Sequence, residues 1–248
     1  AALLYLKFKI NGIREKYKFQ HIVIDEAQDY SPFELFVMRD MVLGSSMTIV
    51  GDTGQSIYYY KGIDDWQKLI QEVLQEDIYY TPLTQSYRST VEIVSFANRV
   101  LRQQKNSLEP AKPVLRHGME PQIIQYEKNK EVVAIIDGIV EEAERAGKKN
   151  VAIICKTYSQ CKELQKLLKK SANKWKLLSD KDKKIDLDKL IIPSYMTKGL
   201  EFDCSIVYDC NDTSYSDSEL DKRLLYVVLT RALHMEYILY KGEKCSLI

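Results

Sequence analysis

The chain has 248 residues, of which 45% are hydrophobic and 29% charged, as is ordinary for a globular protein with one or two full hydrophobic cores. Its 36 lysines and arginines balance 35 acidic residues, so the net charge gives no argument for nucleic-acid binding, which would depend on a local surface. No apolar run approaches the roughly 18 residues that a membrane span needs, and the first ten residues are too short and charged for a signal peptide. We therefore expect a cytoplasmic protein with no membrane partner.

The cysteine pattern argues against a disulfide framework. The five cysteines are odd in number and show neither Cys-x-x-Cys nor zinc-ligand spacing, which predicts free thiols in a reducing compartment. The three histidines lie far apart and away from the cysteines at ligand spacing, so a metal site built on histidine and cysteine is not expected. The chain does not begin with methionine, and we expect it to be part of a longer protein.

Predicted strands and helices alternate from the start of the chain. A first strand at residues 22–24 is apolar enough to be buried on both faces, and it runs directly into Asp25 and Glu26. A helix follows at Ser31-Pro32-Phe33-Glu34, with serine as N-cap, proline at the first helical position and glutamate at the third, and it should end at Gly44. A second strand at 47–50 precedes a loop with two glycines.

The alternation continues through the rest of the chain. Capping boxes are expected at Ser89 with Glu92 and at Ser216 with Glu219, and Ser159 is expected to cap another helix. The mixed-charge run at residues 179–189 predicts a solvated loop rather than a binding tail. Further helices are predicted at residues 65–74, 90–104, 130–146, 160–170 and 217–230, and further strands at 122–126, 151–155, 190–195, 205–208 and 235–240. This order predicts an α/β protein with largely parallel sheets.

Five polar clusters fall at predicted strand ends or helix starts. A strand that delivers paired carboxylates at its carboxyl end places them where open α/β sheets bind ligands. Taken alone, the Asp25-Glu26 pair fits either a catalytic site or a solvated acidic turn. Five clusters in sequence favour a functional site over chance. They are Asp25-Glu26 with Gln28, Gly51-Asp52 with Gln55, Tyr87-Arg88, Gly199 with Glu201, and Arg231.

In this order the clusters resemble the motifs of the UvrD/Rep-like superfamily 1 helicases, over residues 20–240. The strings that carry the resemblance are Asp-Glu-Ala-Gln-Asp at 25–29, Val-Gly-Asp-Thr-Gly-Gln-Ser-Ile-Tyr at 50–58, Tyr-Arg-Ser at 87–89, Lys-Gly-Leu-Glu-Phe at 198–202, and Leu-Leu-Tyr-Val through Thr-Arg-Ala at 224–232. The first and fourth strings look most like helicase IV and the helicase-like factors that remodel RNA polymerase.

The resemblance implies a fold of RecA-like parallel sheets flanked by helices, of the P-loop NTPase type. Two motor domains are expected, with the first one truncated. Residues 1–83 would be the carboxyl-terminal part of the first motor domain, and residues 84–248 the second. ATP would bind in the cleft between them, and alternating closure and opening would move the chain along single-stranded nucleic acid.

The resemblance also implies ATP and Mg²⁺ as cofactors, with three residues of the first domain acting on them. Asp25 would coordinate Mg²⁺, and Glu26 would act as the general base on the hydrolytic water. Gln55 would contact the γ-phosphate or that water and relay its presence to the nucleic-acid groove.

Five residues of the second domain complete the implied nucleotide site. Tyr87 would stack on the adenine, and Gly199 and Glu201 would touch the ribose or the triphosphate. Arg88 and Arg231 would be arginine fingers, which can be worth about 10³–10⁵ in rate. For each arginine the alternative is a surface or interdomain ion pair.

Tyr58, Tyr60 and Lys61 are candidates for nucleic-acid binding. Aromatic rings interleaved with a cation can stack bases and meet phosphates of a single strand, at about 1–3 kcal/mol per stacked base. The family commonly has tryptophan or phenylalanine followed by arginine where this chain has Tyr60 and Lys61, so the same chemistry is kept in a weaker form. The alternative is tyrosines, Tyr59 among them, that pack a sheet edge.

The sequence departs from the family pattern in two places. No GxxxxGK[ST] string occurs, so the loop whose N–H groups and lysine would cradle the phosphates is missing from these residues. We therefore predict that this polypeptide alone does not hydrolyse ATP. Between the Tyr-Arg-Ser and Lys-Gly-Leu-Glu strings, the large inserted domain of UvrD-like enzymes is absent or reduced to the loop at 179–189.

We read the chain as a fragment of an ATP-dependent DNA helicase or translocase that acts on single-stranded DNA or a duplex junction. One alternative is an ATP-driven RNA-polymerase remodelling or recycling factor, toward which the weakened Tyr60-Lys61 site and the near-neutral charge lean slightly. A second alternative is a non-catalytic nucleic-acid-binding module. The full set of six residues argues against it: Asp25, Glu26, Gln55, Arg88, Glu201 and Arg231.

Overall fold

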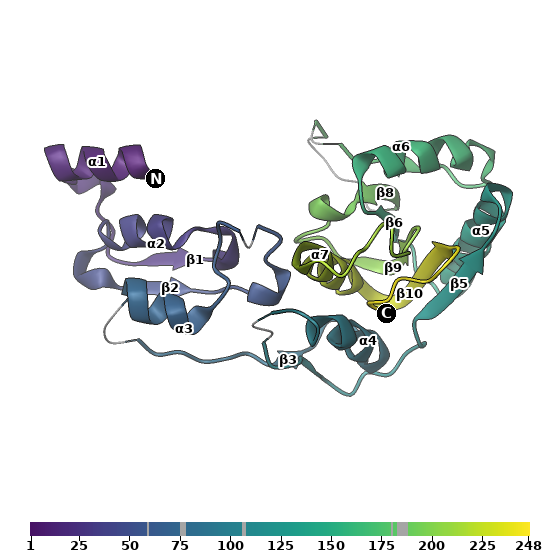
Figure 1. The fold of residues 1–248 in the computed structure, drawn as a ribbon, viewed down its shortest axis with the longest axis horizontal. Helices are drawn as coiled ribbons and strands as arrows, with labels where there is room; N and C mark the ends of the chain where they lie inside the picture. The colour runs from purple at the N-terminus through teal and green to yellow at the C-terminus, as the bar shows by residue number, and fades with distance from the viewer. Residues whose placement is uncertain (59, 75–77, 106–107, 180, 183–187) are drawn as a thin grey trace. The chain divides into compact units, whose positions relative to one another are not determined.

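The computed structural model describes residues 1–58, 60–74, 78–105, 108–179, 181–182 and 188–248 (Figure 1). The chain divides into two compact units, unit 1 at Ala1–Pro82 and unit 2 at Leu83–Ile248. Tyr59 and most of the charged run predicted at 179–189 lie outside the described residues, so the expectations for them stay predictions.

Unit 1 is built around two short parallel strands, β1 (Ile22–Ile24) and β2 (Met47–Ile49), which pair from Ile22 with Met47 to Ile24 with Ile49. Both strands were predicted within a residue. The helices of this unit are α1 (Ala2–Asn11), α2 (Pro32–Arg39) and α3 (Trp66–Leu69), and α3 continues as a π-helical turn at Ile70–Leu74 (Figure 1). Short 3-10 turns lie at Glu15–Tyr17, Ala27–Asp29, Leu43–Ser45 and Thr53–Gln55.

The hydrophobic core of unit 1 lies on one face of the β1–β2 pair. Ile24, Leu35 of α2 and Leu69 of α3 are buried together there. Val23 points to the opposite face and is 69% exposed, and Thr48 beside it on β2 is exposed too. The prediction of a strand buried on both faces was therefore wrong for β1, because helices α2 and α3 contribute to the core on the other face.

Helix α2 begins as the sequence predicts and ends early. Ser31 Oγ accepts the Glu34 N–H at 3.2 Å, and Glu34 Oε2 accepts the Ser31 N–H at 2.8 Å, which completes a capping box. These hydrogen bonds lower the pKa of Glu34. The helix stops at Arg39 rather than at Gly44. The chain after it pairs instead with Phe19: the Phe19 N–H donates to the Met41 oxygen, and the Leu43 N–H donates to the Phe19 oxygen.

The described part of unit 2 forms a six-stranded sheet in the order β5-β10-β9-β6-β8-β7, parallel throughout. Its strands are β5 (Gln122–Tyr126), β6 (Val151–Cys155), β7 (Lys176–Leu177), β8 (Lys189–Pro193), β9 (Phe202–Val207) and β10 (Ala232–Lys241). A separate short parallel pair joins β3 (Gln85–Ser86) to β4 (Lys112–Pro113). The predicted α/β architecture with parallel sheets is confirmed.

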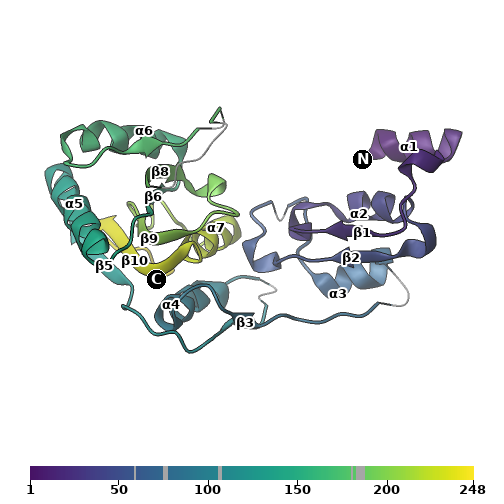
Figure 2. The same ribbon diagram turned by 180° about the vertical axis from the view of Figure 1, so that it is seen from behind.

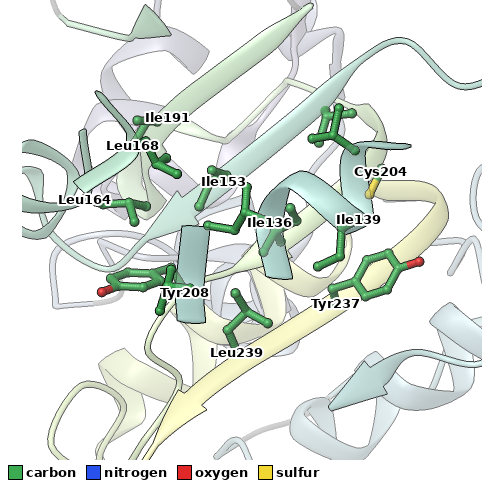
Figure 3. Close-up of a cluster of buried hydrophobic side chains, with 14 of the residues drawn as sticks. Ile136, Ile139, Ile153, Leu164, Leu168, Ile191, Cys204, Tyr208, Tyr237 and Leu239 are labelled. Carbon is green, nitrogen blue, oxygen red and sulfur yellow. The ribbon is translucent and has the colours of Figure 1, made fainter. Parts of the chain in front are cut away.

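Helices cover both faces of this sheet, as Figure 2 shows. On one face, α5 (Asn129–Arg145) and α6 (Tyr158–Leu167) enclose a core that includes Ile136, Ile153 and Leu164 (Figure 3). On the other face, α4 (Val91–Leu101) and α7 (Glu219–Leu229) pack on each other and on β10. Strand β6 is fully buried along its length, as its unbroken apolar run predicts.

The predicted cap of α4 was wrong. Ser89 Oγ donates to the main-chain oxygen of Ala232 at 2.5 Å, and the Glu92 carboxylate accepts from His117 Nδ1 at 2.8 Å and from the Gly118 N–H at 2.9 Å. Both side chains of the expected capping box are thus engaged by segments far away in the sequence. The helix instead begins after Thr90, which makes no side-chain cap bond.

Two other helix starts are each displaced by two positions. Thr157, not Ser159, caps α6: its Oγ1 accepts the Gln160 N–H at 3.2 Å. Ser218, not Ser216, caps α7, and the Ser216 hydroxyl donates to Asp221 Oδ2 at 2.7 Å.

All five cysteines are free thiols and all are buried. Burial raises the pKa of the Cys204 thiol well above its ordinary value. Within the described residues, no helix is long and apolar enough to cross a bilayer.

Candidate functional site

The acidic pair of unit 1 lies where β1 ends. Asp25 and Glu26 are both exposed, and Asp25 Oδ1 accepts the Glu26 N–H at 2.8 Å. Glu26 has φ 52° and ψ 39°, a left-handed conformation that is uncommon for a residue with a side chain. The main chain then turns, and the Ala27 N–H bonds to the Val50 carbonyl oxygen at 2.9 Å, which joins the ends of the two strands.

A buried glutamine connects this loop to the loop that follows β2. Gln28 Nε2 donates to Glu26 Oε2 at 2.5 Å, and Gln28 Oε1 accepts the Asp52 N–H at 2.9 Å. Asp52 Oδ2 in turn accepts from Gln55 Nε2 at 2.8 Å, and its Oδ1 accepts the Gly54 N–H at 2.9 Å. Unit 1 therefore brings Glu26 and Gln55, both proposed from sequence, into one hydrogen-bonded network.

The three candidate nucleic-acid residues of unit 1 lie together after this loop. The Tyr58 carbonyl oxygen accepts the N–H groups of Lys61 at 3.0 Å and Gly62 at 2.9 Å, which closes a tight turn. Tyr60 is 74% exposed, and its ring meets that of Tyr58 edge to face with centroids 6.4 Å apart. Lys61 Nζ lies 5.0 Å from the centre of the Tyr58 ring. The turn thus presents two aromatic rings and a cation at the surface.

The donor set at the end of β1 suits Mg²⁺ that arrives with a nucleotide. The described residues contain no group of three or more histidine, cysteine, aspartate or glutamate side chains placed to hold a metal ion. Mg²⁺ in nucleotide sites needs only one or two carboxylates, because phosphate oxygens and water supply the other ligands. The exposed carboxylate of Asp25, with Glu26 beside it, fits that requirement.

In unit 2 the structure brings Arg88 and Glu201 into contact. Arg88 Nη1 lies 2.9 Å from Glu201 Oε1, and the arginine side chain is 71% exposed. An ion pair as exposed as this contributes little to stability, so it can exchange partners easily. Glu201 follows Gly199, whose φ of 77° is left-handed and favours glycine at the turn before β9.

Arg231 lies at the same end of the sheet but is buried, with 3% exposure. Its Nε donates to the Val227 oxygen at 2.9 Å, and Nη1 donates to the Leu200 oxygen at 3.4 Å, next to Glu201. The Arg231 oxygen accepts the N–H of Phe202, the first residue of β9. The guanidinium therefore ties the end of α7 to the loop that carries Glu201.

Tyr87 lies between β3 and α4 and is 67% exposed. Its hydroxyl donates to Gln85 Oε1 at 2.5 Å, so its ring is anchored at one end while one face remains open to solvent. It is next to Arg88 in the chain. Tyr87, Arg88, Gly199, Glu201 and Arg231 thus gather at one end of the unit 2 sheet.

Two residues of these networks were missed or left without a role in the sequence reading. Arg116 Nη2 donates to the Arg88 oxygen and, at 2.7 Å, to the Leu233 oxygen, so it fastens the Arg88 segment to β10. Arg116 falls in a stretch that reads only as loop, and no motif points to it. Gln28 stands inside the Asp-Glu-Ala-Gln-Asp string, but its burial and its two partners follow from the fold alone.

Two family models match the chain. The model described as the UvrD/REP helicase N-terminal domain matches residues 10–73, and the model described as the UvrD-like helicase C-terminal domain matches residues 81–183. The matched stretches contain the whole unit 1 network and the Arg88 and Arg116 segments.

Among curated proteins, the chain is 29% identical over 164 residues to a putative ATP-dependent DNA helicase, YjcD, of Bacillus subtilis, covering 62% of the chain and 21% of that protein. It is 31% identical over 168 residues to the ATP-dependent DNA helicase PcrA of Staphylococcus aureus, covering 62% and 22%. The chain thus spans about a fifth of the length of these relatives.

Among solved structures, the chain is similar to the crystal structure of the C-terminal domain of a possible DNA helicase from Lactobacillus plantarum. The TM-score is 0.53 at 27% sequence identity, over 65% of this chain and 91% of that one. The sequence matches and this fold similarity agree with the motif order and with the parallel sheets of RecA-like motor domains. The chain belongs to the UvrD/Rep-like family of superfamily 1 helicases.

Proposed function

We propose that this chain is part of an ATP-dependent DNA helicase or translocase that couples ATP hydrolysis to movement on single-stranded DNA. Residues 1–83 would be the carboxyl-terminal part of the first motor domain, and residues 84–248 the second. Family membership supports a motor of this kind, and the relatives reported above are named as DNA helicases.

The observation that carries the proposal is the gathering of Arg88, Glu201 and Arg231 at one end of the unit 2 sheet. The three residues come from segments far apart in the sequence, yet an ion pair and main-chain hydrogen bonds connect them. A module that only binds nucleic acid has no need for two arginines and a glutamate in this arrangement. Phosphoryl transfer does need it, because negative charge develops on the transferred group.

Each unit contributes defined groups to the proposed reaction. In unit 1, Glu26 is the general base on the attacking water, and Gln55 orients that water or the γ-phosphate. Asp25 would hold Mg²⁺, which when bound supplies positive charge to the β- and γ-phosphoryl oxygens.

In unit 2, Arg88 is the more accessible of the two arginine fingers, since its exposed ion pair with Glu201 can be exchanged for a phosphate oxygen. Arg231 is buried, and its guanidinium donates to the oxygen of Leu200, which lies between Gly199 and Glu201. It thereby holds that loop and places a positive charge next to it. Tyr87 offers the open face of its ring to the adenine.

The DNA contacts are assigned to the turn at Tyr58, Tyr60 and Lys61. Two exposed aromatic rings beside a cation can stack bases and meet a phosphate without reading sequence. The relatives are named as DNA helicases, which favours DNA translocation over the remodelling of RNA polymerase.

The test uses the full-length protein that contains this chain. We expect ATP turnover that rises with single-stranded DNA, and a drop of about 10³-fold in kcat for both Glu26→Gln and Arg88→Ala. Arg102→Ala, at an exposed position just after α4, is the matched control and should turn over ATP like the wild type. Equal turnover in Arg88→Ala and the wild type would contradict the assignment of the finger.

Two further measurements separate this function from its alternatives. The 248-residue polypeptide alone should show no ATP hydrolysis, since it lacks a GxxxxGK[ST] loop; Mg²⁺-dependent turnover that Glu26→Gln abolishes would overturn that expectation. The full-length protein should separate DNA strands in the presence of ATP. Release of nucleic acid from RNA polymerase without strand separation would favour the remodelling factor.

A further inference from the structure

We propose that Gln28 is a positioning residue that couples the proposed base Glu26 to the proposed DNA-binding turn of Tyr58, Tyr60 and Lys61. The inference rests on the proposed function, because it assigns Gln28 a part in the response of ATP turnover to DNA. Independently of that function, the hydrogen bonds of Gln28 connect the loop after β1 to the loop after β2.

Gln28 is fully buried, and its side-chain amide is hydrogen-bonded at both ends. Its relative exposure is 0%, its Nε2 donates to Glu26 Oε2 at 2.5 Å, and its Oε1 accepts the Asp52 N–H at 2.9 Å. A buried amide with both ends engaged cannot rotate without leaving a polar group unpaired, which is unfavourable. A shift of either loop therefore moves the other.

The main chain of Gln28 is held by the same loop. Its carbonyl oxygen accepts the Ser56 hydroxyl and the Ile63 N–H, each at 3.2 Å. A Cβ added at Gly51 would lie 2.5 Å from Gln28 Oε1, and one added at Gly62 would clash with the Gln28 oxygen. The main chain at Gly51 and at Gly62 thus packs so closely against Gln28 that there is no room for a side chain at either position.

The carboxyl-terminal part of the loop after β2 is the proposed DNA-binding turn. Gly62 and Lys61 donate their N–H groups to the Tyr58 oxygen, so the turn that presents Tyr58 and Lys61 closes on the glycine that touches Gln28. In the amino-terminal part of the loop, Asp52 holds Gln55 through its second carboxylate oxygen at 2.8 Å. Gln28 is therefore the point at which Glu26, Gln55 and the turn meet.

Glu26 has a conformation that such a contact can control. Its left-handed φ of 52° is a strained state for a non-glycine residue and persists only where neighbouring groups hold it. The hydrogen bond from Gln28 to the Glu26 carboxylate is one such restraint. A displacement of the turn when DNA binds would reach the Glu26 carboxylate through the Gln28 side chain.

Two variants separate the two hydrogen bonds in the full-length protein. Gln28→Glu keeps an acceptor for the Asp52 N–H but replaces the donor to Glu26, whereas Gln28→Met keeps a similar volume and removes both bonds. Gln67→Met, at an exposed glutamine of α3 in the same unit, is the matched control. Thermal unfolding establishes that each variant is folded before its kinetics are compared.

The readout is the ratio of ATP turnover with single-stranded DNA to turnover without it. We expect this ratio to fall about tenfold in both Gln28 variants, with the KM for ATP unchanged, and to stay at the wild-type value in Gln67→Met. A merely structural role would lower the amount of active protein and reduce both rates equally, which leaves the ratio unchanged. An unchanged ratio in a folded Gln28→Glu protein would overturn the proposal.

Hydrogen exchange supplies a second readout that does not depend on activity. Amide exchange across residues 51–62 should be faster in Gln28→Met than in wild type or Gln67→Met, because the Asp52 N–H loses its acceptor. Equal exchange in all three proteins would contradict the connection. If the wild type itself shows no stimulation by DNA while exchange still responds to Gln28→Met, the proposed function fails and the connection between the loops stands.

Discussion

A buried acid in strand β10 should contribute to the pH dependence of the stability of unit 2. Glu236 is 1% exposed, and its Oε2 accepts from Ser205 Oγ at 2.7 Å across the β9–β10 pair. Its Oε1 has no hydrogen-bond partner among the described residues. Burial raises the pKa of Glu236 well above its ordinary value, and the bond from Ser205 offsets only part of that effect.

The sign of the resulting pH effect follows from the direction of the shift. A carboxyl group whose pKa is raised in the folded state stabilises the fold fully below its unfolded pKa of about 4.5, and that contribution is lost as pH rises. We therefore expect Glu236→Gln to raise the Tm at pH 8, because the amide never ionises and keeps a hydrogen bond with Ser205. The gain should disappear near pH 4, where the wild-type carboxyl is already protonated.

Thermal unfolding between pH 4 and pH 8 measures this difference. The matched control is Glu243→Gln, at an exposed glutamate just after β10, which should unfold like the wild type throughout. A Tm difference for Glu236→Gln that is independent of pH would contradict the assignment, since only a titrating group produces the convergence at low pH.

At the scale of single elements, the start of α6 separates a real helix cap from an apparent one. Thr157 accepts the Gln160 N–H and Gln160 Oε1 accepts the Thr157 N–H at 3.1 Å, whereas Ser159 is an exposed residue inside the helix. Thr157→Ala should cost about 1 kcal/mol of unfolding free energy. Ser159→Ala should change it by less than about 0.5 kcal/mol. Denaturant unfolding of the two variants tests the pair, and a larger loss for Ser159→Ala would place the cap where the sequence suggested.

The comparison of caps shows which elements the sequence could predict. Strands of unit 2 such as β6 were predicted correctly because an unbroken apolar run leaves a buried parallel strand little choice. The cap of α4 was not, because Ser89 and Glu92 fit a local motif but bond to Ala232 and His117, which only the tertiary fold brings near. A local sequence pattern does not show which long-range partners compete for the same side chains.

The same distinction applies to the candidate site. Motif strings pointed to Glu26, Gln55, Arg88 and Glu201, because in their order they resemble the motifs of the UvrD/Rep-like helicases. They did not predict that Arg88 would contact Glu201, or that Arg116 would fasten the Arg88 segment to β10. These contacts join segments from opposite ends of unit 2. They depend on which strand ends become neighbours when the sheet assembles, and no local pattern encodes that order.

At the scale of the whole molecule, the two units are connected by a segment that is open to solvent. The described residues from Ile78 to Thr84 belong to no helix or strand. Tyr79 is 93% exposed and Leu83 87%, values higher than those of most large apolar side chains in this protein. Aromatic residues in an irregular, exposed segment are where a protease with a hydrophobic specificity pocket can bind the chain.

We therefore expect brief digestion with chymotrypsin to cut first at Tyr79 or Tyr80. Tyr60 is one competing site among the described residues, since it is 74% exposed, but its main chain belongs to the turn closed by hydrogen bonds at the Tyr58 oxygen. A protease must extend the residues around the bond it cleaves, so the turn protects Tyr60, whereas the segment at 78–84 belongs to no helix, strand or turn that would have to open. Intact masses over a digestion time course identify the first cut. The double substitution Tyr79→Ser with Tyr80→Ser should delay it, and a first cut at Tyr60 would show that the turn at 58–62 opens more readily than its hydrogen bonds imply.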